Sequence, residues 1–294
     1  MAKWRVVVNQ SAGRSPLAVT AIREALDAAG VDAAIEAPQT RAEAEDAVRD
    51  AVRAGTTHLA MAGGDGSVNL AANVILGIVG VEPPVIGVLP TGTGCDLLRT
   101  FGIPQDLGDA ARHLATDEVY PIDVATVEGS WGIRHFVNVA QVGVGAAAAQ
   151  TAQKLGRGLG AVRYPIAFAL RLSRFPATRV TVKTERRTYE SEALAVIMAN
   201  AQFFAGGWNV APKATLVDGV LDMQVIDCAK RRAPALVPKI IKGTHLTDRA
   251  VRRFSAANFA IETDVPWPLE VDGDYVGNTP VAGRVVPAAL RLKI

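Results

Sequence analysis

Residues 59–69, LAMAGGDGSVN, decide the fold. The apolar run at 58–62 predicts a buried strand that leads into Gly63-Gly64-Asp65-Gly66-Ser67, and a helix is expected from about Val68 to Leu76. Glycines let the backbone turn tightly and approach a ligand closely, because no Cβ intervenes. The N-terminus of a helix offers N–H groups and partial positive charge, which suit a phosphate. The stretch therefore predicts a βα unit with a phosphate-binding turn at the carboxyl end of its strand.

An ordinary glycine-rich βα turn has the same glycines, so Asp65 is the more informative residue. A carboxylate repels phosphate unless it positions a metal ion or takes a proton. The loop has neither the G-x-x-x-x-G-K nor the G-x-G-x-x-G spacing. A second small-residue loop, within VIGVLPTGTGCD at 85–96, follows the next apolar run, and two such loops at neighbouring strand ends predict one shared ligand site.

Apolar runs alternate with helical patterns throughout the first half of the chain, at 4–8, 31–37, 58–62 and 85–89. Single helices between strands imply parallel pairing and a sheet covered on both faces. After about Asp123 most segments read as strands, so we expect an α/β domain at 1–126 and a mostly β, sandwich-like domain at 127–294.

Composition excludes several classes of protein. The 294 residues carry 31 Lys and Arg against 29 Asp and Glu, a net charge of +2, which argues against a strongly basic nucleic-acid binder. Two cysteines far apart, Cys95 and Cys228, argue against a disulfide framework and suit a reducing compartment, so a cytoplasmic location is expected. Neither a signal peptide nor a membrane span is expected from the hydropathy pattern.

Six segments in order resemble the signatures of the diacylglycerol kinase catalytic family, which includes bacterial lipid kinases and sphingosine kinases. GGDGSVN and LPTGTGCDLLR resemble its two glycine loops, and VVVNQSAGR resembles its opening strand and loop. FVNVAQVGVGA, APKATLVDGVLDMQVI and EVDGDYV resemble three segments of its second domain. The resemblance implies an α/β nucleotide-binding domain followed by a β-rich domain.

The resemblance also implies a site. Nucleotide (ATP) contacts would come from Asn9, Ser11, Gly13, Thr40, Gly63, Gly64, Asp65, Gly66, Ser67, Asn69 and Thr93. Thr40 also begins a T-x-x-E capping box, so it has a structural role as a helix N-cap.

The resemblance implies a metal position too. Asp218 would offer its side chain, and Thr215 and Val220 their carbonyl oxygens, a hard oxygen set that suits Mg²⁺. A β-turn at Asp218-Gly219 is the alternative explanation of that segment.

Four positions depart from the family pattern. Leu70 stands where the family has Glu, Cys95 where it has Asn, and Gln10 where it has Pro. Asp274 stands where the family's proposed general base is Glu, and its side chain is one methylene shorter. We expect Asp274 to be the catalytic base, with Asp65 as the alternative.

The function expected from the resemblance is ATP-dependent phosphorylation of a hydroxyl on diacylglycerol or a related lipid alcohol, with Mg²⁺ as cofactor. An NAD kinase-like enzyme and a nucleotide-binding module that has lost catalysis stay as alternatives. The acceptor's apolar tail would occupy the β-rich domain. Peripheral contact with a membrane and assembly into a homodimer both stay open.

Overall fold

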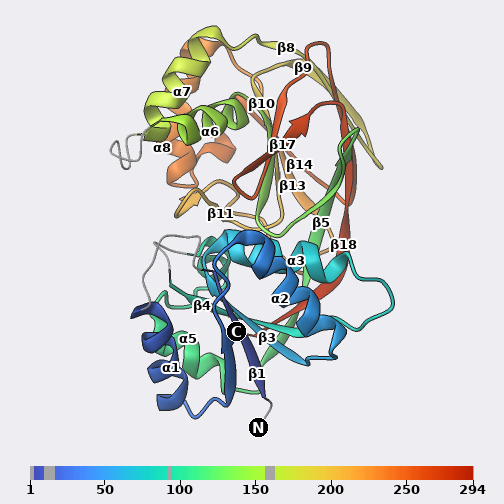
Figure 1. Ribbon diagram of the computed structural model, residues 1–294. Coiled ribbons are helices and arrows are strands. Elements are labelled where there is room, and N and C mark those ends of the chain that lie inside the picture. The colour runs from blue at the N-terminus through green and yellow to red at the C-terminus, as the bar shows by residue number, and fades with distance from the viewer. Residues whose placement is uncertain (1–2, 10–16, 92–94, 156–162, 294) are drawn as a thin grey trace. The chain divides into compact units, whose positions relative to one another are not determined.

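Four strands of the first half form a parallel sheet in the order β2-β1-β3-β4 (Figure 1). They are β1 (Trp4–Val8), β2 (Ala33–Glu36), β3 (His58–Gly63) and β4 (Val85–Pro90). The structure is a computed structural model, and it describes residues 3–9, 17–91, 95–155 and 163–293. Strands β3 and β4 are buried along almost their whole length, as expected for strands covered on both faces.

Five helices belong to this sheet: α1 (Leu17–Ala28), α2 (Arg41–Arg53), α3 (Asp65–Leu76), α4 (Asp96–Thr100) and α5 (Leu107–Leu114). Ile22 and Leu26 of α1 and Leu114 of α5 share one apolar core with β1, β3 and β4. Helices α2 and α3 pack against each other. The predicted α/β domain is confirmed by this arrangement.

The chain divides into two compact units, residues 1–124 with 287–294, and residues 125–286. Two strands, β5 (Val119–Gly129) and β18 (Val281–Lys293), run from one unit into the other. The sequence-based boundary between 126 and 127 lies near the first crossing. The last strand was assigned to the second domain, but its residues from Pro287 onward belong to the first unit, where Arg291 and Leu292 pair parallel to β4.

Six antiparallel strands form the main sheet of the second unit, in the order β14-β13-β10-β7-β16-β17. They are β7 (Val139–Gly143), β10 (Ala195–Ala199), β13 (Leu221–Ile226), β14 (Val251–Ala256), β16 (Pro268–Val271) and β17 (Asp274–Asn278). A second layer is built from the first part of β18 together with β5, β6 (Gly132–Phe136), β8 (Thr178–Thr184), β9 (Thr188–Ala193) and β15 (Asn258–Thr263).

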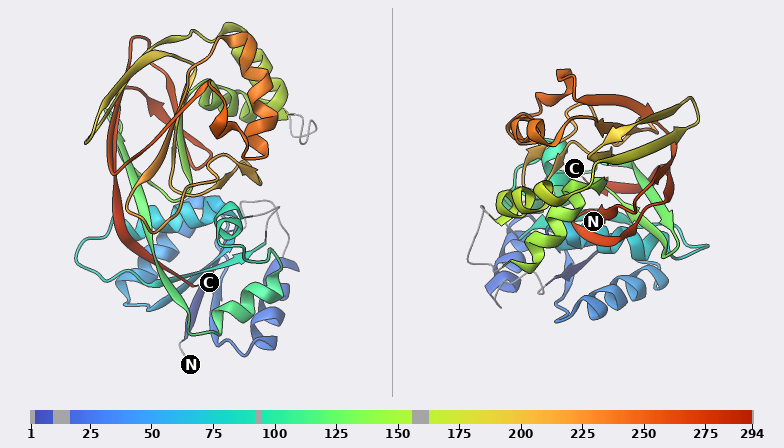
Figure 2. Two further views of the ribbon diagram at one scale, coloured as in Figure 1. Left: turned by 180° about the vertical axis from the view of Figure 1, so that it is seen from behind. Right: turned by 90° about the horizontal axis from the view of Figure 1, so that it is seen from above.

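Apolar side chains from both layers form one core, to which Val142, Met198 and Met223 contribute from the six-stranded sheet, and Val182 and Ile261 from the other layer. Figure 2 shows the yellow-green and orange helices of this unit on one side of the six-stranded sheet. The expected β-rich, sandwich-like second domain is therefore confirmed.

Three helices cover the outer face of the six-stranded sheet: α6 (Val144–Lys154), α7 (Arg163–Arg174) and α8 (Ala233–Ile241). The short hairpin β11 (Phe203–Phe204) and β12 (Trp208–Asn209) lies next to α8, and the 3-10 turns η3 (Lys230–Arg232) and η4 (His245–Thr247) flank that helix. None of the helices in the described part of the chain has the length and apolar character needed to cross a membrane.

The start of one helix differs from the sequence-based expectation. Helix α3 starts at Asp65 rather than Val68, so the glycine loop and the start of the helix coincide. A two-residue bend at 137–138 separates β6 from β7, and these two strands belong to different sheets.

Candidate functional site

The first glycine loop is tightly packed at its start. A Cβ placed on Gly63 would lie 2.0 Å from Ser67 Oγ, so only glycine allows the Ser67 side chain to fold back over the end of β3. Asn9, at the end of β1, donates from Nδ2 to Ser67 Oγ at 3.1 Å. Gly64 is the N-cap of α3 and has no side chain to occupy the first turn. The structure thus brings Asn9, Gly63 and Ser67 together beside the N-terminus of a helix, the arrangement expected of a phosphate site.

Asp65 joins the two glycine loops. Its Oδ2 accepts from Asp96 N at 2.9 Å, and its Oδ1 accepts from Leu97 N at 3.0 Å. Asp65 therefore caps the first turn of α4, the short helix that follows the second loop. Thr91 N also donates to Gly63 O at 3.3 Å. The carboxylate expected to act on a metal ion or a proton thus also holds the start of α4 against the first loop.

Cys95 and Leu70, two of the residues that differ from the family pattern, are both buried. Cys95 Sγ lies 3.5 Å from Asp65 Oδ1, and Cys95 N donates to Gln105 Oε1 at 2.6 Å. Burial raises the pKa of the Cys95 thiol well above its ordinary value, and the nearby negative charge of Asp65 raises it further. Cys95 is therefore an inert, protonated packing residue rather than a reactive thiol.

Other predicted contacts of the first unit have local structural roles. Thr40 caps α2 as expected, since its Oγ1 accepts from Glu43 N at 3.2 Å, while Glu43 Oε2 accepts from Gln39 N at 2.8 Å. Asn69 is buried on α3, and its Oδ1 accepts from Asn73. Gly66 is exposed, with open space where a Cβ would lie. Ser11, Gly13 and Thr93 lie outside the described residues.

A tight hairpin presents Asp274 in the second unit. Asp272 and Gly273 both have positive φ, 45° and 93°, which is the signature of a type I′ turn between β16 and β17. The Asp272 carboxylate accepts three backbone N–H groups, from Val137, Asn138 and Val139, at 2.9, 3.0 and 2.9 Å. The two acidic residues of this D-G-D segment thus have different environments: Asp272 is held in place by backbone donors, and Asp274 has a half-exposed side chain.

Asp274 faces a basic neighbour. Arg134 Nη2 of β6 lies 3.7 Å from Asp274 Oδ2, and 48% of the Asp274 side chain is exposed. The half-exposed side chain leaves the Asp274 carboxylate accessible, and its role as the catalytic base stays a prediction.

The predicted metal position lies on a turn before β13. Asp218 is exposed, its Oδ1 accepts from Val220 N at 3.2 Å, and Gly219 has a φ of 71°. The expected β-turn at Asp218-Gly219 is therefore present. The donors available from Thr215, Asp218 and Val220 are all oxygens, and this set fits a Mg²⁺ ion that keeps several waters. Across the described residues, no cluster of three or more His, Cys, Asp or Glu side chains forms a metal site.

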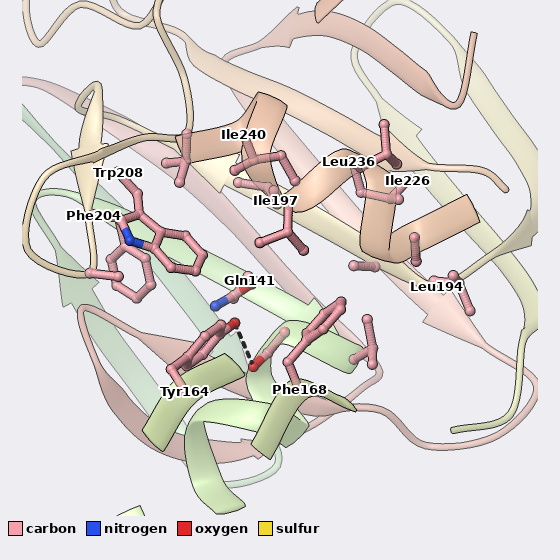
Figure 3. A pocket seen from close by; sticks show the side chains of 17 residues that line it. Gln141, Tyr164, Phe168, Leu194, Ile197, Phe204, Trp208, Ile226, Leu236 and Ile240 are labelled. Carbon is pink, nitrogen blue, oxygen red and sulfur yellow. Dashed lines mark hydrogen bonds between the residues drawn. The ribbon is translucent and has the colours of Figure 1, made fainter. Parts of the chain in front are cut away.

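A pocket opens in the second unit between the six-stranded sheet and its helices (Figure 3). It encloses about 680 Å³ of empty space, part of it open to solvent. Aromatic and aliphatic side chains line it, among them Phe168 of α7, Trp208 of β12, Ile197 of β10 and Leu236 of α8. Such a pocket suits an apolar chain.

Three polar residues at this site were missed by the sequence analysis. Gln141 lines the pocket, Glu270 accepts a hydrogen bond from Gln141, and Asp272 accepts three backbone N–H groups at the β16–β17 hairpin. The D-G pair at 272–273 is a sequence signal for a hairpin turn and could have identified Asp272. Gln141 and Glu270 have no such local signal, because their partnership depends on the pairing of β7 with β16.

Comparison with known proteins agrees with this architecture. Residues 3–127 match the diacylglycerol kinase catalytic domain, and residues 138–294 match the YegS C-terminal NAD kinase beta sandwich-like domain. "Lipid kinase YegS" of Escherichia coli (strain K12) is 26% identical over 257 residues, which cover 84% of this chain and 81% of that protein. "Probable lipid kinase YegS-like" of Serratia proteamaculans (strain 568) is 28% identical over 250 residues, which cover 84% and 79% of the two chains.

A crystal structure of a diacylglycerol kinase from Bacillus anthracis str. Sterne shares the fold. It superposes with a TM-score of 0.73 at 21% identity and covers 99% of this chain and 96% of the other. At that identity the likeness supports the two-domain architecture alone.

The glycine loops of the first unit, the β sandwich of the second and the two domain matches define a kinase, a phosphotransferase with an α/β domain and a β-rich domain. The second match alone covers more than half of the chain. The chain belongs to the diacylglycerol kinase catalytic family and carries the YegS C-terminal domain, as the sequence resemblance predicted.

Proposed function

We propose that this protein is an ATP-dependent lipid kinase that phosphorylates a hydroxyl group of diacylglycerol or a related lipid alcohol. The observation that carries the proposal is the apolar pocket of the second unit, because a kinase whose acceptor is a small polar molecule has no need of one. The relatives named as lipid kinases support the same assignment.

In the proposed reaction, the phosphates of ATP bind at the first glycine loop, where Gly64 is the N-cap of α3 and has no side chain beside the N-terminus of that helix. The lipid oxygen forms a bond to the γ-phosphorus, and the bond from that phosphorus to the β–γ bridging oxygen breaks, so ADP leaves. Asp274 takes the hydroxyl proton, and Asp65 positions the start of α4. Mg²⁺ supplies neutralisation of the phosphate charge when it is bound.

An NAD kinase-like activity is the first alternative. The aromatic and aliphatic lining of the pocket favours a hydrocarbon chain over a dinucleotide. The second alternative is a nucleotide-binding module without catalysis, which Leu70, Cys95 and the short Asp274 side chain would favour. Cys95 and Leu70 are packed in the first unit, so they fill space rather than remove a catalytic group from the described loop.

Incubation of the full chain with labelled ATP, Mg²⁺ and a panel of diacylglycerols, sphingoid bases, glycolipids, prenols and NAD separates these functions. We expect label in a lipid product. Label in NADP alone would replace the proposal with NAD kinase activity, and thermal stabilisation by ATP without any product would support the binding module.

We also propose that the protein reaches its acceptor at a membrane surface through α7 and α8. Both helices line the pocket, and both expose large apolar side chains: Ile166 is 39% exposed, Leu170 55% and Ile241 39%. Arg174, the last residue of α7, and Lys242, the C-cap of α8, are exposed and would attract anionic lipids. Co-sedimentation with vesicles containing phosphatidylglycerol should fall for Leu170→Glu, and equal binding of the two proteins would reject this surface.

A cytoplasmic location remains part of the proposal, because Cys95 and Cys228 are free cysteines and such thiols persist in reducing compartments. Homodimer formation stays a prediction.

A further inference from the structure

The apolar pocket of the second unit has a polar patch in its wall. Gln141 of β7 projects into the lining beside Tyr164 of α7, in the midst of aromatic and aliphatic side chains (Figure 3). The Tyr164 hydroxyl donates to Gly145 O at 3.4 Å. Among the described residues lining the pocket, Gln141 is the one with a side-chain amide. An amide in such a place offers both a hydrogen-bond donor and an acceptor to whatever occupies the pocket.

Two neighbours fix the orientation of this amide. Glu270 of β16 is the cross-strand partner of Gln141, and Glu270 Oε2 accepts from Gln141 Nε2 at 2.5 Å. A Cβ on Gly145 would lie 2.2 Å from Gln141 Oε1, so only glycine leaves room for the amide there. Gln141 is 8% exposed and Glu270 3% exposed. The hydrogen bond to Glu270 occupies one of the two Gln141 donors, and the Gln141 side chain also interacts with the Tyr164 hydroxyl. An oxygen of a ligand would therefore compete with Tyr164 for the second donor.

Ionisable groups around this pair come from three elements. Asp272 and Asp274 lie on the β16–β17 hairpin, and Tyr164 lies on α7; Lys154 of α6 is exposed. Burial raises the pKa of Glu270 to about 8, the charges of Asp272 and Asp274 add to the shift, and the bond from Gln141 opposes it. Burial also raises the pKa of the Tyr164 hydroxyl. The polar patch is therefore uncharged at pH 7.

We propose, on the basis of the lipid kinase function above, that Gln141 binds an uncharged oxygen of the acceptor lipid inside the pocket, such as an ester carbonyl or a hydroxyl, and that Glu270 is the residue that positions the Gln141 amide. A pocket of this kind selects a chain bearing an uncharged oxygen over a bare hydrocarbon. It also disfavours a long-chain amine, whose ammonium group would require Glu270 to ionise in a buried place.

Binding measured without ATP tests the subsite directly. The probes are decanoylglycerol, decane and decylamine, which share a chain length and differ in the polar group. We expect Gln141→Met to weaken decanoylglycerol binding by about fivefold, the equivalent of one neutral hydrogen bond, and to leave decane binding unchanged. Gly145→Ala should have the same selective effect, because its Cβ would displace the amide.

A matched control is available on the neighbouring strand. Gln224 of β13 lies in the same cross-strand row as Gln141, but its amide bonds to Val210 O and to Asp222, and it does not line the pocket. Gln224→Met should leave the preference for decanoylglycerol over decane unchanged. A loss of preference in this variant equal to that of Gln141→Met would overturn the assignment.

The pH profile distinguishes a positioning role of Glu270 from a purely structural one. Ionisation of Glu270 above about pH 8 should weaken decanoylglycerol binding in the wild-type protein. Glu270→Gln, which keeps the acceptor oxygen but cannot ionise, should bind as the wild type does at pH 7 and lose the decline at high pH. Decylamine that binds more tightly than decanoylglycerol, with affinity rising with pH, would replace the proposal with recognition of a cation.

Failure of the subsite and failure of the lipid kinase function give different results. Equal decanoylglycerol binding by the wild type and Gln141→Met, with lipid phosphorylation intact, overturns the subsite alone. Absence of any labelled lipid, with ATP binding intact, overturns the kinase proposal.

Discussion

Replacing Asp65 with Asn tests the dual role that the structure indicates for this carboxylate. The two Asp65 oxygens accept different backbone donors, Asp96 N at Oδ2 and Leu97 N at Oδ1. Asparagine has the same shape but only one acceptor oxygen. In Asp65→Asn one of the two N–H groups would therefore face an NH₂ group, and the negative charge at the start of α4 would be lost.

The expected loss follows from these contacts. A hydrogen bond to a charged group contributes about 1.5–3 kcal/mol, so removing one of the two should lower the free energy of unfolding by about 2 kcal/mol. For a unit of this size, 1 kcal/mol shifts the melting temperature by roughly 2–4 °C, which gives a fall of roughly 4–8 °C. Phosphotransfer should fall with it, because the start of α4 is no longer held against the first loop.

Thermal unfolding and phosphotransfer are measured on Asp65→Asn and on a matched control, Asp106→Asn. Asp106 caps α5, but a single oxygen, Oδ1, accepts both Gly108 N at 2.9 Å and Asp109 N at 3.1 Å. Asparagine can keep both of these bonds, so the control should stay within about 1 kcal/mol of the wild type.

An unchanged melting temperature in Asp65→Asn would refute the argument from the two separate oxygens. A lowered melting temperature with full activity in the folded protein would restrict Asp65 to capping α4, and would leave Asp274 as the catalytic carboxylate.

Three further outcomes are expected. Gly64→Ala should weaken ATP binding by more than it lowers stability, because Gly64 has a φ of −114° that alanine can adopt; equal ATP affinity by calorimetry would show that the loop does not approach a phosphate. Asp274→Asn should lower turnover by about 10²–10⁴-fold with little change in ATP affinity, and Asp274→Glu should retain activity; wild-type turnover in the Asn variant would reject Asp274 as the base. The pKa of Glu270 in the folded protein, about 8, lies above its ordinary value, so the folded protein keeps the Glu270 proton to a higher pH than the unfolded chain does. The free energy of unfolding should therefore fall as the pH rises from about 4 to about 8. Glu270 should lower the free energy of unfolding by at most about 1.4 kcal/mol per pH unit in this range. In denaturant unfolding measurements, Glu270→Gln should lose this part of the pH dependence.

The nucleotide half of the site could be read from the sequence because its signals are local. The strand, the glycine loop and the helix start lie within 59–76, and the T-x-x-E cap at Thr40 lies within one turn. The error at the start of α3 arose because glycine and aspartate are poor formers of a helix interior, whereas an acidic residue is favoured in the first turn, next to the positive end of the helix dipole.

Tertiary structure alone decided the partners of the acidic residues. Asp65 bonds to Asp96, 31 positions away, Asp272 bonds to Val137, 135 positions away, and Gln141 bonds to Glu270, 129 positions away. No periodicity or spacing encodes such pairs, because they exist only once the strands have paired and buried the side chains. The sequence by itself determined the α/β domain with its first glycine loop, and the β-rich domain that follows, because their signals are local. The packing of distant strands decided which carboxylates are held by backbone donors, which one is half-exposed, and which one is buried behind an apolar pocket, where burial raises its pKa.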